Sequence, residues 1–214
     1  MSNVRGKLIV ITGCDGSGKT TITNLLRKER PDVMNIKTPL PPYNKFREVF
    51  TGDDERNTFK TFPYFQNALK NDQKFIQSIL DSGRSVILER YIETTWAFHL
   101  TNCFLNSVDP KEEMLDLSLP KPDLTVVLTA DSIKRMGRIE ERNGKKDWWE
   151  YYEFQYLYQN RLIEQAKRLS PNVRIIDTGI HTIDETKTII NREIDKLNNN
   201  DGILLTNQNN RDTI

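Results

Sequence analysis

One stretch near the N-terminus combines glycines, a lysine and a hydroxyl at a spacing that suits phosphate binding. The residues Gly13-Cys14-Asp15-Gly16-Ser17-Gly18-Lys19-Thr20 match the pattern G-x-x-x-x-G-K-[ST]. Glycines let backbone N–H groups converge on phosphate oxygens, and the following helix directs its positive end at the same anion. Lys19 neutralises phosphate charge, and Thr20 supplies a hydroxyl for Mg²⁺. The expected nucleotide-binding residues are Gly13, Asp15, Gly16, Ser17, Gly18, Lys19, Thr20 and Thr21.

A second group of reactive side chains, Glu89-Arg90-Tyr91, follows a short apolar run. A strand that ends here would lie beside the phosphate loop in a parallel sheet. Glu89 can hold Mg²⁺ or accept a proton, and Arg90 can clamp the phosphate of an acceptor through two hydrogen bonds. A structural ion pair at the end of the strand is the alternative interpretation.

A third group of charged residues lies between Arg135 and Lys146. Arg138 and Arg142 are four residues apart and would share one face of a helix. The intervening Glu140 and Glu141 leave open a second interpretation, a solvated helix with its own ion pairs.

The elements that must position these groups follow an alternating pattern. Short apolar runs separated by segments of helical period are typical of an α/β protein with a parallel sheet. Strands are expected at 7–12, 33–37, 85–88, 124–128 and 173–176. Helices are expected at 19–30, 43–50, 59–81, 94–106, 132–141, 148–169 and 183–197. The pattern predicts a three-layer α/β/α sandwich with a five-stranded parallel sheet, which binds ligands at the carboxyl ends of its strands.

Length and composition predict one domain, at residues 1–197. The remaining residues, 198–214, are rich in Asn and Asp with few large apolar groups, and we expect a disordered tail. Basic and acidic residues number 31 and 30, so a nucleic-acid polymer is not the expected partner. The apolar runs are too short to span a membrane. Two cysteines make no disulfide framework, which favours a reduced, cytoplasmic compartment.

Other nucleotide-binding classes fit less well. A GTPase switch would need an Asn-Lys-x-Asp element after a strand, and the nearest match, at residues 143–147, lies in a charged loop between helices. A motor or transporter ATPase would need an apolar strand that ends in Asp-Glu, and the chain has none. A kinase of a small metabolite remains the favoured class.

The chain resembles the thymidylate kinase family of P-loop nucleoside monophosphate kinases. The resemblance rests on Asp15 within the phosphate loop, on Glu89-Arg90-Tyr91 where the family has Asp-Arg-Tyr, and on Leu119-Pro120-Lys121-Pro122-Asp123-Leu124. It implies ATP and Mg²⁺ as cofactors, a nucleotide acceptor such as dTMP, and a homodimer. It also implies that Asp15 acts near the acceptor and that a lid at 135–147 closes over ATP. In the lid, Arg135 would contact ATP, and Arg138 and Arg142 would stabilise the transferring phosphoryl group.

The acceptor region departs from the family pattern. Leu69 stands where family members often carry an arginine, and residues 37–42 replace an arginine-containing loop. Arg47 remains available for the acceptor phosphate, and Arg90 and Tyr91 complete that side of the expected site.

Two alternatives therefore stay open. The Glu89-Arg90 pair is similar to deoxynucleoside kinases, in which a glutamate acts as base toward a sugar hydroxyl. Those enzymes hold the base with aromatic and Gln side chains, for which Phe62, Phe65 and Gln66 are the candidates. A non-catalytic module that binds ATP is the second alternative.

Overall fold

A computed structural model describes residues 5–44, 58–115, 118–143 and 152–209. Five parallel strands form one sheet in the order β2-β3-β1-β4-β5. The strands are β1 (Leu8–Gly13), β2 (Met34–Lys37), β3 (Val86–Glu89), β4 (Leu124–Thr129) and β5 (Val173–Asp177). Because all strands run the same way, their carboxyl ends meet at one edge of the sheet.

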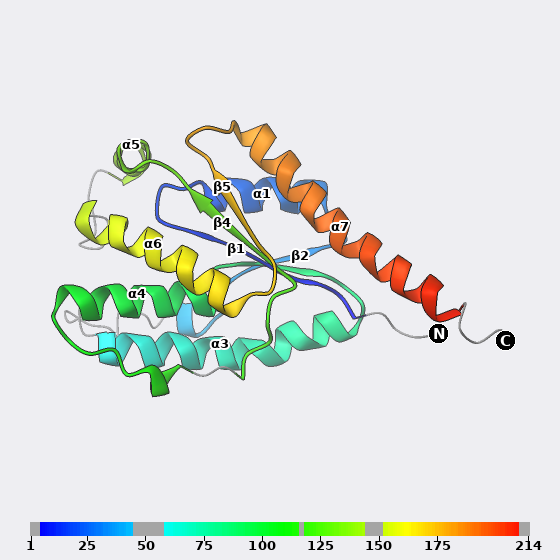
Figure 1. Cartoon of the computed structure of the whole chain (residues 1–214), viewed down its shortest axis with the longest axis horizontal. Coiled ribbons are helices and arrows are strands. Elements are labelled where there is room, and N and C mark those ends of the chain that lie inside the picture. Colours follow the sequence, from blue (N-terminus) through cyan, green and yellow to red (C-terminus); the bar gives the residue numbers. More distant parts are fainter. Residues whose placement is uncertain (1–4, 45–57, 116–117, 144–151, 210–214) are drawn as a thin grey trace.

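Helices cover both faces of this sheet (Figure 1). Helices α1 and α7 lie on one face, and α3, α4 and α6 lie on the other. The helices are α1 (Lys19–Glu29), α3 (Thr58–Asp81), α4 (Ile92–Leu105), α5 (Ser132–Asn143), α6 (Tyr152–Leu169) and α7 (Ile183–Asn209), with a 3₁₀ turn at Glu112–Met114. The predicted three-layer sandwich with a five-stranded parallel sheet is confirmed.

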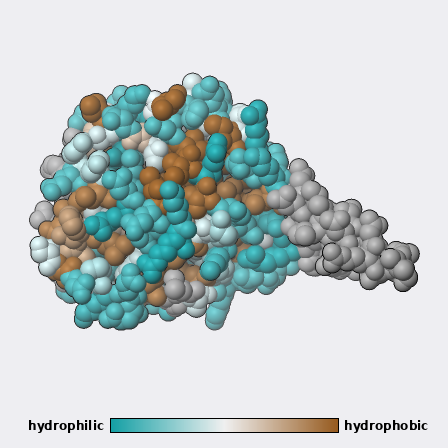
Figure 2. All heavy atoms as spheres, in the orientation of Figure 1, coloured by the Kyte–Doolittle hydropathy of each residue, from teal (hydrophilic) through white to brown (hydrophobic). Residues whose placement is uncertain are grey.

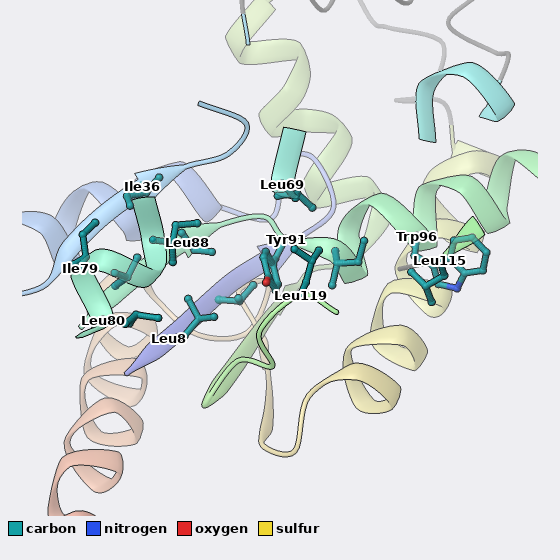
Figure 3. Close-up of a cluster of buried hydrophobic side chains, with 14 of the residues drawn as sticks. Leu8, Ile36, Leu69, Ile79, Leu80, Leu88, Tyr91, Trp96, Leu115 and Leu119 are labelled. Carbon is teal, nitrogen blue, oxygen red and sulfur yellow. The ribbon is translucent and has the colours of Figure 1, made fainter. Parts of the chain in front are cut away.

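The central strand β1 faces two cores in alternation. Leu8 and Val10 pack in a cluster with α3 and α4, whereas Ile9 and Ile11 pack in a cluster with α1 and α7. Figure 3 shows the first cluster, which includes Leu69 of α3. This alternation is the two-residue period of a strand that is buried on both faces. It fixes the register of β1 and therefore the position of the phosphate loop that follows it.

The edge strand β5 is less covered than β1. On the face shown in Figure 2, hydrophobic residues gather around β5, between α6 and α7, and Ile175 of this strand is exposed. A strand with one neighbour and partial cover keeps apolar surface in contact with water, which is common at sheet edges. Within the described residues, no helix is both long enough and apolar enough to cross a membrane.

Helix α7 is longer than the sequence predicts. The expected end was near Leu197, but the helix continues to Asn209. Residues 198–209 therefore extend the last helix where the sequence predicts a tail without regular structure. Their composition explains the difference in part, because this stretch contains no proline and a helix ends most sharply at proline.

Candidate active site

The phosphate loop connects the central strand to α1 and is shaped by glycines. Gly16 and Gly18 adopt φ values of 76° and 88°, in the left-handed region that favours glycine. A Cβ atom on Gly16 would lie 2.5 Å from the backbone oxygen of Arg135, so no larger residue fits there. Gly18 caps α1 without a side-chain hydrogen bond, which leaves the first N–H groups of the helix directed at the cleft. N–H groups at a helix N-terminus favour a bound anion.

Lys19 begins α1 and reaches back over the loop. Its Nζ donates to the carbonyl oxygen of Cys14 at 2.8 Å and lies 3.5 Å from Oδ1 of Asp15. Burial, followed by the charge of Arg90, lowers the pKa of Lys19 from 10.5 to about 8, although Asp15 opposes the shift. The ammonium of Lys19 is therefore fixed in position by the loop, and its 3.5 Å contact with Asp15 is too long for a strong ion pair.

Arg90 follows β3 and forms an ion pair with Asp15. Its guanidinium donates to Oδ1 of Asp15 at 2.7 Å. Burial opposes the charge on Arg90, but Asp15, Tyr158 and Glu89 together outweigh burial and hold the pKa of Arg90 above its ordinary value. Arg90 adopts a φ of 75°, which costs a non-glycine residue about 1–2 kcal/mol. The hydroxyl of Thr38 donates to the carbonyl of Arg90 at 2.8 Å and stabilises this turn.

Glu89, the last residue of β3, is buried and accepts hydrogen bonds from α1. The hydroxyls of Thr20 and Thr23 donate to its two carboxylate oxygens at 2.9 and 3.0 Å, and Nζ of Lys37 lies 3.5 Å away. Burial alone would raise the pKa of Glu89, but Lys37, the two hydroxyls and Lys19 outweigh it. The pKa lies below its ordinary value, so the side chain is a carboxylate at neutral pH.

The predicted lid arginines occupy different environments. Arg138 is exposed and donates to the carbonyl oxygens of Gly16 and Thr178 at 3.0 and 2.9 Å. Arg135 is buried, and its guanidinium donates to the carbonyl of Ala130 at 3.0 Å and to the side chain of Gln155 at 2.7 Å. The side chain of Arg142 lies outside the described residues. The structure thus places Arg138 in the lining of the cleft, whereas Arg135 is buried and does not line the cleft as the predicted contact with ATP requires.

A cleft of about 610 Å³ joins these residues along the carboxyl edge of the sheet. Of the predicted residues, it is lined by Asp15, Gly16, Gly18, Lys19, Thr20, Thr21, Glu89, Arg90 and Arg138. Sequence reasoning missed a second set of lining residues, namely Ile22, Lys37, Thr178, His181, Thr182, Ile183 and Thr186. Most of this set follows β5, and the rule that ligands bind beyond the carboxyl ends of parallel strands would have indicated that loop.

Two predicted acceptor residues lie in the protein interior. Phe62 is buried against Trp96 and His99, with ring centroids 5.0 and 4.7 Å apart. Tyr91 is buried as well, and its hydroxyl donates to the carbonyl of Pro120 at 3.0 Å. Both side chains belong to the hydrophobic cluster between the sheet and helices α3 and α4, in which Figure 3 labels Tyr91 and Trp96.

The three other predicted acceptor residues, Gln66, Phe65 and Arg47, differ in how far the structure describes and buries them. Gln66 is buried and donates to the carbonyl of Met114 at 2.8 Å. Phe65 is half-buried, and its ring lies edge-on to Tyr64 at 5.4 Å. Arg47 falls outside the described residues. Within the described part of the chain, Phe65 is therefore the predicted aromatic side chain with surface available to a ligand.

The fold and this cleft define a P-loop nucleotide kinase. A family model described as thymidylate kinase matches residues 11–190, and the chain belongs to the thymidylate kinase family. A probable thymidylate kinase from Pyrobaculum aerophilum is 28% identical over 178 residues, which is 80% of this chain and 88% of the relative. A thymidylate kinase from Desulfotalea psychrophila is 29% identical over 155 residues, which cover 68% and 74% of the two chains.

Solved structures agree with this assignment. The thymidylate kinase of Candida albicans superposes with a TM-score of 0.75 and 27% identity, and covers 91% of this chain and 93% of its own. A deoxyadenosine kinase from M. mycoides superposes with a TM-score of 0.65 at 18% identity, over 88% and 99% of the two chains, which shows a shared fold. The protein is a phosphotransferase of the nucleotide kinase type, and ATP is the phosphate donor of its family.

Proposed function

We propose that the protein transfers the γ-phosphoryl group of ATP to dTMP, forming ADP and dTDP. One observation carries the reaction type: a phosphate loop with Lys19 and a strand end with Glu89 and Arg90 line the same cleft. Membership of the thymidylate kinase family and relatives of that name support dTMP as the acceptor.

We propose further that Thr20 and Glu89 hold the Mg²⁺ ion of the ATP complex. Hydroxyl and carboxylate oxygens are ligands that suit this hard cation, which usually adds substrate phosphates to one or two carboxylates. Oγ1 of Thr20 and Oε1 of Glu89 are 2.9 Å apart, so both can face a single ion. When bound, Mg²⁺ neutralises charge on the phosphate oxygens.

The remaining cleft residues divide the work between donor and acceptor. Lys19 and the N-terminus of α1 bind the donor phosphates, because they provide a positive charge and unpaired N–H groups. Arg90 binds the acceptor phosphate, and Asp15 orients its guanidinium through the 2.7 Å hydrogen bond. Phosphoryl transfer needs mainly such positioning and charge stabilisation.

We also propose that the segment 135–147 closes over ATP as a lid. Arg138 and Arg142 would then supply positive charge to the phosphoryl group, and closure would exclude water. The hydrogen bonds of Arg138 to Gly16 and Thr178 support a position beside the phosphate loop. Family resemblance supports a homodimer, and two free cysteines, Cys14 and Cys103, support a reducing cytoplasmic location.

A coupled assay for ADP release tests the acceptor. The full chain is incubated with ATP and Mg²⁺ and with each deoxy- and ribonucleoside monophosphate, and the free nucleosides are assayed in parallel. We expect turnover with dTMP and little with thymidine. Turnover with nucleosides only would make Glu89 the base of a deoxynucleoside kinase. ATP binding without turnover on any acceptor would instead indicate a non-catalytic module.

A further inference from the structure

Lys37 lines the cleft but has no role in the proposed transfer of phosphate. It ends the edge strand β2, directly beside Glu89 in the register of the parallel pair β2–β3. Its Nζ lies 3.5 Å from Oε1 of Glu89, which is an ion pair at the outer limit of a hydrogen bond. The side chain is 64% exposed and lines the cleft. An ammonium group has three donors, so this single contact leaves donors available to a ligand.

The other cations of the described lining are already held by the protein. Lys19 is buried and donates to the carbonyl of Cys14, and Arg90 is paired with Asp15 at 2.7 Å. Arg138 donates to backbone carbonyls of the phosphate loop and of the loop after β5. Lys37 differs from these cations, because its side chain is 64% exposed and the contact with Glu89 at 3.5 Å is the polar contact that the described residues show for it.

Strand order indicates which substrate Lys37 faces. The phosphate loop follows the central strand β1, so the donor phosphates lie at the middle of the cleft. On the β4–β5 side, the lining is rich in threonines and includes Ile183, which suits a nucleobase. On the β3–β2 side it presents two cations, Arg90 and Lys37, which suit a phosphate, beside the carboxylate of Glu89. The acceptor phosphate therefore approaches from the side of β2.

We propose that Lys37 binds the phosphate group of the acceptor nucleotide and so favours a monophosphate over a free nucleoside. This inference rests on the proposed function. A nucleoside monophosphate is close to a dianion at neutral pH, whereas Asp15 neutralises most of the charge that Arg90 offers. Lys37 supplies the second positive charge.

Binding measurements without ATP or Mg²⁺ test this role directly. Isothermal titration with dTMP and with thymidine is carried out on the wild type, Lys37→Met, Lys37→Arg and the matched control Lys74→Met. Lys74 is an exposed lysine of α3 that does not line the cleft. We expect Lys37→Met to weaken dTMP binding about tenfold, Lys37→Arg to restore most of it, and thymidine binding to stay within about twofold. Equal affinities for dTMP in Lys37→Met and the wild type would overturn the proposal.

A double-variant cycle separates phosphate binding from an effect transmitted through Glu89. If Lys37 contacts the phosphate, Lys37→Met should weaken dTMP binding about tenfold in a Glu89→Gln background as well. If Lys37 serves only as the counterion of Glu89, its replacement will have no effect once Glu89 is neutral, and the proposal is wrong. A wild type that binds no nucleoside monophosphate would refute the proposed function together with this inference. Normal wild-type turnover with an unchanged Lys37→Met variant would refute the inference alone.

Discussion

Arg90 and Tyr91 are neighbours in the chain, yet they belong to two regions with different tasks. The guanidinium of Arg90 lies in the cleft and bonds to the side chain of Asp15. The ring of Tyr91 enters the core, and its hydroxyl bonds to the backbone of Pro120. In the first region, side chains of the cleft hold one another in place for a ligand. In the second region, polar groups such as the Tyr91 hydroxyl form hydrogen bonds within the protein interior, so they are not available to a substrate.

Replacement of Lys19 tests the first region most severely. Lys19→Ala removes the lysine of the phosphate loop, and we expect kcat to fall on the order of 10³-fold, because single groups that stabilise transition-state charge have effects of this size. Steady-state ADP release measures the loss, and circular dichroism checks that the fold is intact. Substantial activity in Lys19→Ala would refute the assignment of the phosphate loop.

Replacement of Phe62 tests the second region. Phe62→Ala should lower the free energy of unfolding by about 3 kcal/mol, because it leaves a cavity beside Trp96 and His99. Urea denaturation measures this loss. The half-buried Phe65 offers a matched variant, Phe65→Ala, which should destabilise less and raise the KM for the acceptor more. If Phe62→Ala instead raised that KM while stability held, Phe62 would be a substrate residue after all.

These two regions also differ in how far the sequence predicts them. The phosphate loop is contiguous, and its glycines, Lys19 and Thr20 have fixed spacing because one backbone turn must wrap one phosphate. The strands were equally predictable, since each is a short apolar run between helices. The surroundings of Phe62 and Tyr91 depend on which partners α3 and α4 meet in space. Residue type alone cannot distinguish an aromatic ring that stacks on a base from one that packs in a core.

Lys37 and the loop after β5 show a second limit of the sequence. Their residue types are ordinary, and what brings them to the cleft is strand order, which places β2 and β5 at opposite edges of the sheet. Arg135 is the opposite case, since the sequence predicts a residue that contacts ATP, but its guanidinium is buried and donates hydrogen bonds to Ala130 and Gln155. Such placements become visible only when the helices are packed.

Glu89 lies at the boundary between the two regions, since it is buried yet lines the cleft. Glu89→Gln keeps the shape but removes the charge, and we expect kcat to fall about 10²-fold with a smaller change in the KM for the acceptor. Steady-state kinetics over a range of Mg²⁺ concentrations measures both effects, and the variant should need more Mg²⁺. A variant with wild-type kcat would remove Glu89 from the mechanism and leave it a structural partner of Thr20 and Thr23.

The smallest effect is expected from a change of pH, which alters the affinity for ATP through the charge of Lys19 in the cleft. Burial lowers the pKa of Lys19 to about 8, so the ammonium is charged below that pH and becomes neutral as the pH rises through it. ATP affinity of the free enzyme should therefore decrease about tenfold between pH 7.5 and pH 9. Fluorescence titration with ATP measures the decrease, and Lys19→Ala serves as the control whose weaker binding should not change over this range. An affinity that is constant to pH 9 in the wild type would mean that Lys19 keeps its proton in the cleft, and that its neighbours Asp15 and Glu89 outweigh burial.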